Sequence, residues 1–197
     1  WIENELQQLR AKDLERRLTP YPEAGGRIRI AGRTYLNFSS NDYLGLSSHP
    51  EVVRTSRKFL NAYGCGATAS RLVSGTLDAH EELEQTIASF KGYSHAMVFG
   101  SGFLTNAGII PALVGRSDYV FADKLVHASI IDAVTLSRAK LYRFRQNDVN
   151  NLKSLLRQCT SNGRKLIVTE SVFSMDGDLA PLPEIGSEAV EYGAMLM

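Results

Sequence analysis

The sequence predicts an α/β fold with three layers, in which a mostly parallel sheet is flanked by helices. Short β-rich runs alternate with helix-like stretches from Pro50 onward, and this alternation is typical of such folds. The runs recur roughly every 22 to 30 residues, the length of a βα unit with its crossover. They are also short and apolar, as strands covered on both faces are.

Residues 1–46 differ from the rest of the chain and form a predicted lead-in segment. Apolar residues near helical spacing, with charges between them, predict an amphipathic helix over residues 2–18, ended by Pro20. Arg27–Ile30 and Thr34–Phe38 flank Ala31-Gly32 and predict a small hairpin. The main domain is therefore expected over residues 47–197.

The alternating elements of residues 47–197 can be placed in order. Ser48 is expected to cap a helix that has Pro50 in its first turn and runs to about Tyr63. A Gly-rich loop, Gly64–Gly75, follows, and Asp78 opens the next helix. Later helices are expected at 103–114, 129–138, 149–159 and 183–192. Strands are expected at His95–Phe99, Tyr119–Ala122, Leu141–Phe144, Leu166–Thr169 and 194–197.

The two ends of the sequence predict an incomplete domain. The chain starts with Trp1 and stops after an apolar run, Ala194–Met197, that is typical of a buried strand. Because a finished domain rarely ends inside its own core strand, we expect the large domain to be truncated here.

Composition excludes several classes of function. The formal net charge is +1, with basic and acidic residues interspersed, so no basic footprint for nucleic acid or membrane exists. Cys65 and Cys159 are far apart in the sequence, which argues against a disulfide framework and for a reducing compartment. Neither has metal-ligand spacing to a histidine. A cytoplasmic protein without a metal site is expected.

Two candidate sites follow predicted strands, where ligands bind in parallel sheets. Ser101, Gly102 and Phe103 lie between a strand and a helix, and backbone N–H groups at such a place can hold a phosphate. The alternative is a tight turn without a ligand. His127 lies just past a strand end, where it can cover a flat ligand or move a proton. The alternative is a helix cap.

Five further positions have a functional and a structural interpretation. Glu170 and Ser174 follow a strand, and a carboxylate there can orient a ligand, although the segment also has turn chemistry. Asn41 lies in a polar stretch that is either part of a site or an Asx turn. Arg16 and Arg17 can bind a carboxylate or form a solvated helix face.

Six short runs along the chain form a recognisable series. They are Asn37–Leu46 (NFSSNDYLGL), Gly64–Gly75 (GCGATASRLVSG), His80–Glu84 (HEELE), Gly100–Phe103 (GSGF), His127–Ile130 (HASI) and Val168–Asp178 (VTESVFSMDGD). Read together, these runs resemble the α-oxoamine synthases, which are fold-type I enzymes that use pyridoxal 5'-phosphate (PLP). One such run is weak support, whereas six in the family's order, over nearly the whole chain, are strong support.

The resemblance implies a decarboxylative condensation in a cytoplasmic homodimer. The runs NDYLGL, SRLVSGT and VFSMDGD are most similar to the biotin-pathway branch of the family. That branch joins L-alanine to pimeloyl-CoA or pimeloyl-acyl carrier protein. A sister branch such as glycine C-acetyltransferase, and a non-catalytic binding module, are the alternatives.

The same resemblance assigns roles to the candidate residues. It implies that Ser101, Gly102 and Phe103 bind the cofactor phosphate. It implies that His127 stacks on the pyridine ring as a catalytic residue. Asn106, Glu170 and Ser174 are implied at the cofactor, and Asn41 is implied at the substrate carboxylate. Either Arg16 or Arg17 matches the family's substrate-binding arginine, and Arg16 is the residue chosen here.

Two family features are not found in these 197 residues. The family's Asp-x-x-His motif is expected just past Met197, and the Schiff-base lysine is expected further on. None of the lysines present lies in the family's lysine motif: Lys12, Lys58, Lys91, Lys124, Lys140, Lys153 and Lys165. Without that lysine no base removes the α-proton. We therefore expect these residues alone to be inactive.

Overall fold

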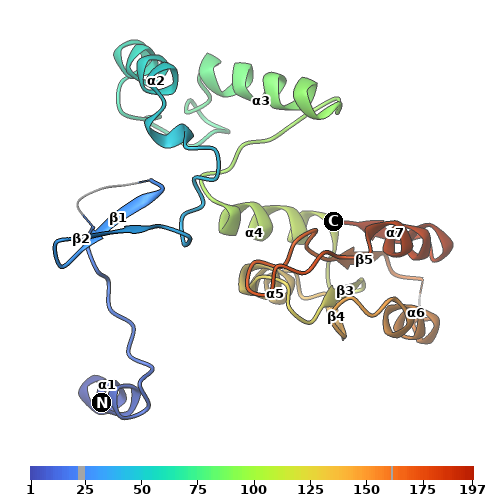
Figure 1. Cartoon of the computed structure of the whole chain (residues 1–197). Helices are drawn as coiled ribbons and strands as arrows, with labels where there is room; N and C mark the ends of the chain where they lie inside the picture. Colours follow the sequence, from blue (N-terminus) through green and yellow to red (C-terminus); the bar gives the residue numbers. More distant parts are fainter. Residues whose placement is uncertain (22–24, 161) are drawn as a thin grey trace. The chain divides into compact units, whose positions relative to one another are not determined.

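Figure 1 shows a computed structural model of the chain, which describes residues 1–21, 25–160 and 162–197. The chain separates into two compact units, Trp1–Glu81 and Glu82–Met197. Their boundary falls inside helix α3 (Asp78–Lys91). The predicted division after residue 46 stays a prediction.

The first unit begins with α1 (Ile2–Ala11), which is shorter than expected. The prediction of a helix to residue 18 is wrong, because Asp13 has a φ of 54° and Leu14 N–H bonds back to Leu9 O. No residue of α1 is buried, and a short helix without packing is only marginally stable. The predicted hairpin is confirmed as β1 (Arg27–Ile30) and β2 (Arg33–Leu36), which pair antiparallel.

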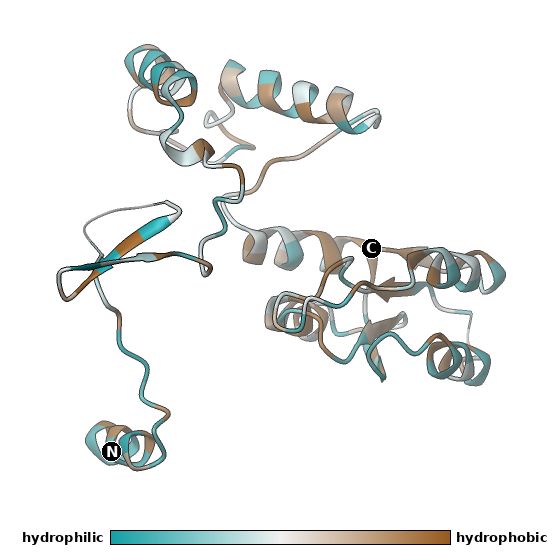
Figure 2. Cartoon of the chain, in the orientation of Figure 1, coloured by the Kyte–Doolittle hydropathy of each residue, from teal (hydrophilic) through white to brown (hydrophobic). Residues whose placement is uncertain are grey.

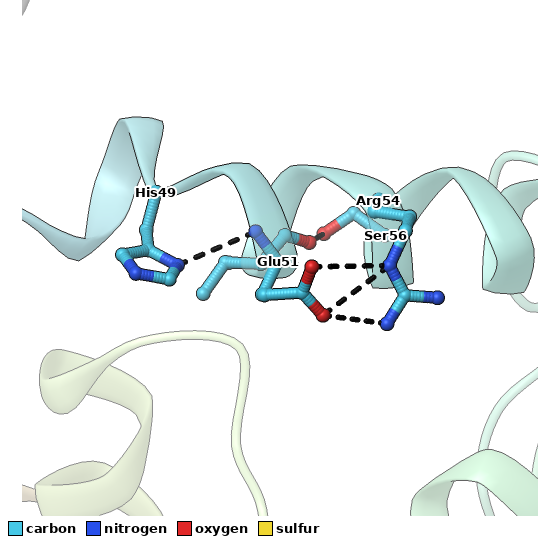
Figure 3. Close-up of polar contacts among 5 residues, drawn as sticks. His49, Glu51, Arg54 and Ser56 are labelled. Atoms are coloured by element: carbon cyan, nitrogen blue, oxygen red, sulfur yellow. Dashed lines mark hydrogen bonds and ion pairs between the residues drawn. The ribbon is translucent and has the colours of Figure 1, made fainter.

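Helix α2 (Pro50–Tyr63) starts where it was expected, but with a different cap. Figure 3 shows the Nδ1 atom of His49 accepting a hydrogen bond from the Glu51 N–H, at 3.3 Å. Ser48 instead ends a short 3-10 turn, η1 (Leu46–Ser48). Because Pro50 occupies the first helical position, the residue directly before it becomes the cap. The prediction of Ser48 as the cap is therefore wrong.

The Gly-rich loop between α2 and α3 is folded back on itself. Gly75 N–H bonds to Ser70 O at 2.9 Å, and the Thr76 hydroxyl donates to Arg71 O at 2.7 Å. A Cβ added to Gly75 would lie 1.8 Å from Ala69 O. Only glycine fits at this close approach of two backbone segments.

The second unit contains the predicted parallel sheet. Its strands are β3 (Tyr119–Asp123), β4 (Lys140–Phe144), β5 (Lys165–Val168) and β6 (Met195–Leu196). Among the described residues they form a four-stranded sheet in the order β4-β3-β5-β6, with all neighbours parallel. Each strand overlaps the run expected for it from the sequence.

Helices cover both faces of this sheet, as expected for three layers (Figure 1). Side chains at alternate positions of β3 enter different cores. Val120 and Ala122 pack with α4 (Gly102–Leu113) and α5 (Ala128–Ser137), whereas Tyr119 and Phe121 pack with α6 (Val149–Gln158) and α7 (Leu182–Glu191). In Figure 2, α6 and α7 carry both hydrophilic and hydrophobic colours, as amphipathic helices do.

One expected strand is not formed. His95–Phe99 has no regular secondary structure and pairs with no strand among the described residues. Its Val98 N–H donates to a side-chain oxygen, Glu84 Oε1, at 2.9 Å. The prediction is wrong in this structure because a run with strand propensity becomes a strand only when a neighbour supplies the ladder.

Candidate active site

The candidate site lies in the second unit, at the edge where the parallel strands end. Asp123, the last residue of β3, is fully buried. Its carboxylate accepts hydrogen bonds from Leu125 N–H and Asn147 N–H, both at 2.9 Å. One side chain thus orders the loop after β3 and the loop after β4. This anchoring fixes the start of the segment that leads to His127.

The first turn of α4 offers unpaired backbone donors. Ser101 is the N-cap of the helix, and its hydroxyl accepts from Leu104 N–H at 3.2 Å. Gly102 and Phe103 are the next two residues, and N–H groups at these positions have no partner within a helix. A Cβ at Gly102 would meet nothing within 4 Å. The helix start is therefore open, and its predicted role in binding a phosphate stays a prediction.

A hydrogen-bonded group joins α4, α5 and the end of β5. Asn106 Nδ2, one turn into α4, donates to Ser129 Oγ at 2.9 Å. Ser129 Oγ lies 2.7 Å from His127 Nδ1. The backbone N–H of His127 donates to Glu170 Oε1. Three residues predicted from separate motifs, Asn106, His127 and Glu170, are thus brought together.

His127 also caps α5, because its Nδ1 accepts from Ser129 N–H at 3.2 Å. The sequence left a ligand-covering role and a cap as alternatives, and the cap is observed. The two are compatible, because His127 stays exposed while its backbone is tied to Glu170.

Ser174 lies in a turn close to Glu170 along the chain but outside the hydrogen-bonded group. Phe173 O accepts from Gly177 N–H at 2.8 Å, and Gly177 has a φ of 73°. The turn chemistry expected for this segment is therefore present. Ser174 is exposed, and its predicted place at the cofactor stays a prediction.

The predicted substrate-binding residues belong to the first unit. Arg17 pairs with Glu15 at 2.7 Å, and Arg16 is exposed. Both residues follow α1 and are not helical, so the prediction that they lie on the first helix is wrong. Asn41 Oδ1 accepts from the Tyr43 hydroxyl at 3.3 Å. The roles predicted for Arg16 and Asn41 stay predictions.

The Gly-rich loop borders a hollow in the first unit. The hollow measures about 390 Å³ and lies between α2, the loop and the start of α3. His80 in its wall already accepts from Leu77 N–H at 3.0 Å, and Cys65 beside it is a single thiol. These side chains do not form a polar group that could bind one ligand, so the hollow is not assigned as a site.

Sequence reasoning missed Ser129 and Asp123. Ser129 is only 2% exposed, yet it bonds to two of the predicted site residues. Its signal was a small polar residue two positions after a candidate histidine. Asp123 directly follows the strand expected at Tyr119–Ala122 and was given no role. The sequence signal for Asp123 was a carboxylate at the end of an apolar run. A carboxylate in that place is expected to be buried, and a buried charge usually has a specific partner.

The described residues contain no group of three or more His, Cys, Asp or Glu side chains able to hold a metal ion. Within the same residues, no helix has both the length and the hydrophobicity needed to cross a membrane.

The fold and the site together define a class of protein. A parallel sheet with helices on both faces, an open helix start and polar groups at the strand ends is typical of proteins that bind phosphate-bearing cofactors. Residues 33–197 match the family model described as aminotransferase class I and II. The chain belongs to this family.

The chain is also similar to individual named proteins. The chain is 51% identical, over 197 residues, to a protein from Geobacter sulfurreducens named 8-amino-7-oxononanoate synthase. It matches the serine palmitoyltransferase of S. paucimobilis, solved with a bound PLP-myriocin aldimine, with a TM-score of 0.89 and 33% identity over 99% of this chain. It matches the crystal structure of 8-amino-7-oxononanoate synthase from Francisella tularensis with a TM-score of 0.65 and 33% identity over 77% of this chain.

The match covers only part of these proteins. The chain spans 50% of the Geobacter protein, 50% of the serine palmitoyltransferase and 41% of the Francisella enzyme. The predicted resemblance to the α-oxoamine synthases is confirmed by these names and by the shared fold.

Proposed function

We propose that these residues form the first half of a PLP-dependent synthase. This enzyme condenses L-alanine with a pimeloyl thioester and releases carbon dioxide, giving 8-amino-7-oxononanoate. The observation that carries the proposal is the open start of α4 beside the hydrogen-bonded residues Asn106, His127 and Glu170. The relative named 8-amino-7-oxononanoate synthase, 51% identical over 197 residues, supports the choice of substrates.

The residues at the start of α4 fit the phosphate of PLP. In the proposal, the N–H groups of Gly102 and Phe103 donate to the phosphate oxygens, and Ser101 holds the helix start in place. The absence of any atom within 4 Å of a Cβ at Gly102 leaves room for this approach. When bound, PLP supplies the electron sink that stabilises negative charge on the α-carbon of the amino acid.

The remaining site residues orient the cofactor and substrate in this proposal. The His127 ring covers the flat face of the cofactor, and Glu170 holds the His127 backbone in position. Asn106 and Ser174 line the cofactor site. Arg16 and Asn41, from the first unit, bind the carboxylate of L-alanine. The enzyme works as a homodimer in the cytoplasm.

A substrate panel on the full chain that carries these residues tests the proposal. L-alanine, glycine and L-serine are each offered with pimeloyl-CoA, pimeloyl-acyl carrier protein, acetyl-CoA and palmitoyl-CoA in the presence of PLP. We expect the highest kcat/KM for L-alanine with a pimeloyl thioester. Glycine lacks one methyl group, and the loss of one such contact costs about tenfold or more.

Two other outcomes of the substrate panel would indicate a different function. A preference for glycine with acetyl-CoA identifies the sister glycine C-acetyltransferase activity instead. No product with any pair, together with no PLP binding, supports a non-catalytic module. The 197 residues tested alone serve as the matched control. We expect no product from them, because none of their lysines lies in the family's lysine motif.

A further inference from the structure

The hydrogen bonds around His127 determine which of its ring nitrogens carries the proton. His127 Nδ1 lies 3.2 Å from the backbone N of Ser129 and 2.7 Å from Ser129 Oγ. A backbone N–H can only donate, so Nδ1 must be the acceptor of that bond. In a neutral imidazole one nitrogen accepts and the other carries the proton. The proton therefore belongs on Nε2.

The Ser129 hydroxyl also donates to His127 Nδ1. Its oxygen accepts from Asn106 Nδ2 at 2.9 Å, and an amide NH₂ group can only donate. The hydroxyl hydrogen is thus left for His127 Nδ1, at the shorter distance of 2.7 Å. Ser129 is 2% exposed, so water does not compete for this hydrogen. The hydrogen bonds therefore run in one direction, from Asn106 to Ser129 and from Ser129 to His127 Nδ1.

We propose that Ser129 is a positioning residue that holds His127 in the tautomer protonated on Nε2. The inference rests on the proposed function in one respect, namely that His127 faces the cofactor and the amino acid. Nδ1 is satisfied by the protein, whereas Nε2 bonds to none of the described residues. The Nε2–H group is then a fixed donor for a ligand oxygen, such as one of the amino-acid carboxylate.

The arrangement requires a hydroxyl at position 129. Ser129→Ala removes the stronger of the two donors to Nδ1 and leaves the backbone N–H. Ser129→Thr keeps the hydroxyl. Ser137 is a matched control, because it is also buried on α5. Its hydroxyl donates to Val134 O at 2.7 Å, away from His127.

The test is nitrogen NMR of the histidine rings in the full chain, labelled with ¹⁵N-histidine and measured without PLP. A His127→Gln variant assigns the resonances of His127. We expect the wild type, Ser129→Thr and Ser137→Ala to show a bare Nδ1 and a protonated Nε2. In Ser129→Ala the ratio of the Nδ1–H to the Nε2–H form should rise about fivefold, the factor that corresponds to one neutral hydrogen bond of about 1 kcal/mol.

Two results would overturn the inference: a protonated Nδ1 in the wild type, or an unchanged ratio in Ser129→Ala. Thermal unfolding separates positioning from general stability, because Ser129→Ala and Ser137→Ala both lose a buried hydroxyl. Only the Ser129 variant should change the tautomer. The readout needs neither PLP nor turnover. A failed substrate panel with a protonated Nε2 would therefore remove the proposed function and leave this inference standing.

Discussion

Residues 82–197 bury a hydrophobic core, whereas residues 1–81 bury none of their described large apolar side chains and leave most of them exposed. In the second unit, Phe121, Phe144 and Leu152 are at most 1% exposed. In the first unit, Phe38 is 92% exposed and Leu72 is fully exposed. Every buried hydrophobic residue of the described chain belongs to the second unit. Local sequence pattern forms helices and strands in both units, but only the second unit encloses its apolar faces.

The difference shows what a sheet contributes to a domain. In the second unit, alternate residues of β3 and β5 feed two cores, and two helices close each of them. In the first unit, the sheet has two strands, and a hairpin alone is marginally stable in water. None of the described hydrophobic side chains of the first unit is buried.

The largest effect is expected for matched phenylalanines in the two units. Phe121→Ala should lower the free energy of unfolding of the second unit by about 3–5 kcal/mol, because it leaves a cavity in a closed core. Phe38→Ala should change the stability of the chain by less than about 0.5 kcal/mol, because the ring is already in water. Urea unfolding followed by circular dichroism measures both.

Equal losses for the two phenylalanine variants would contradict the comparison. They would mean that the first unit also has a packed core in solution.

A smaller effect is expected at the ion pair in which the exposed Arg164 side chain contacts the buried Asp118 carboxylate. Asp118 is 4% exposed and accepts from Gly115 N–H and Arg164 Nη2, both at 2.8 Å. Asp118→Ala leaves the part-buried N–H groups of Gly115 and Arg164 without an acceptor and should cost about 2–3 kcal/mol. Asp132→Ala is the control, because Asp132 is exposed on α5 and should cost less than about 0.5 kcal/mol. A similar loss in both variants in urea would refute this expectation.

The same ion pair predicts a dependence on pH. Burial alone raises the pKa of Asp118, but the bonds from Gly115 N–H and Arg164 outweigh it and lower the pKa. The stabilisation is therefore present above the unfolded pKa of about 3.9 and is lost as the pH falls through the folded pKa. The stability difference between wild type and Asp118→Ala should shrink below about pH 4. A constant difference between pH 6 and pH 3 would rule this out.

The sequence by itself determined the class of fold and most of its elements. Alternation of β-rich runs and helical stretches located β3, β4, β5 and β6 because strand and helix periods are local properties of the chain. Six short motifs pointed to the family, and the helix expected at 103–114 is observed as α4, one residue earlier.

Tertiary structure decided what local pattern cannot specify. His95–Phe99 has strand composition, but no strand lies beside it among the described residues. The helix expected to residue 18 ends at Ala11, and none of its residues is buried. Ser129 joins the site only because α4 and α5 pack together, which brings Asn106 within 2.9 Å of its hydroxyl. Hydrogen bonds between residues far apart in sequence depend on that packing, and for this reason the sequence predicted Asn106 and His127 but not the residue that connects them.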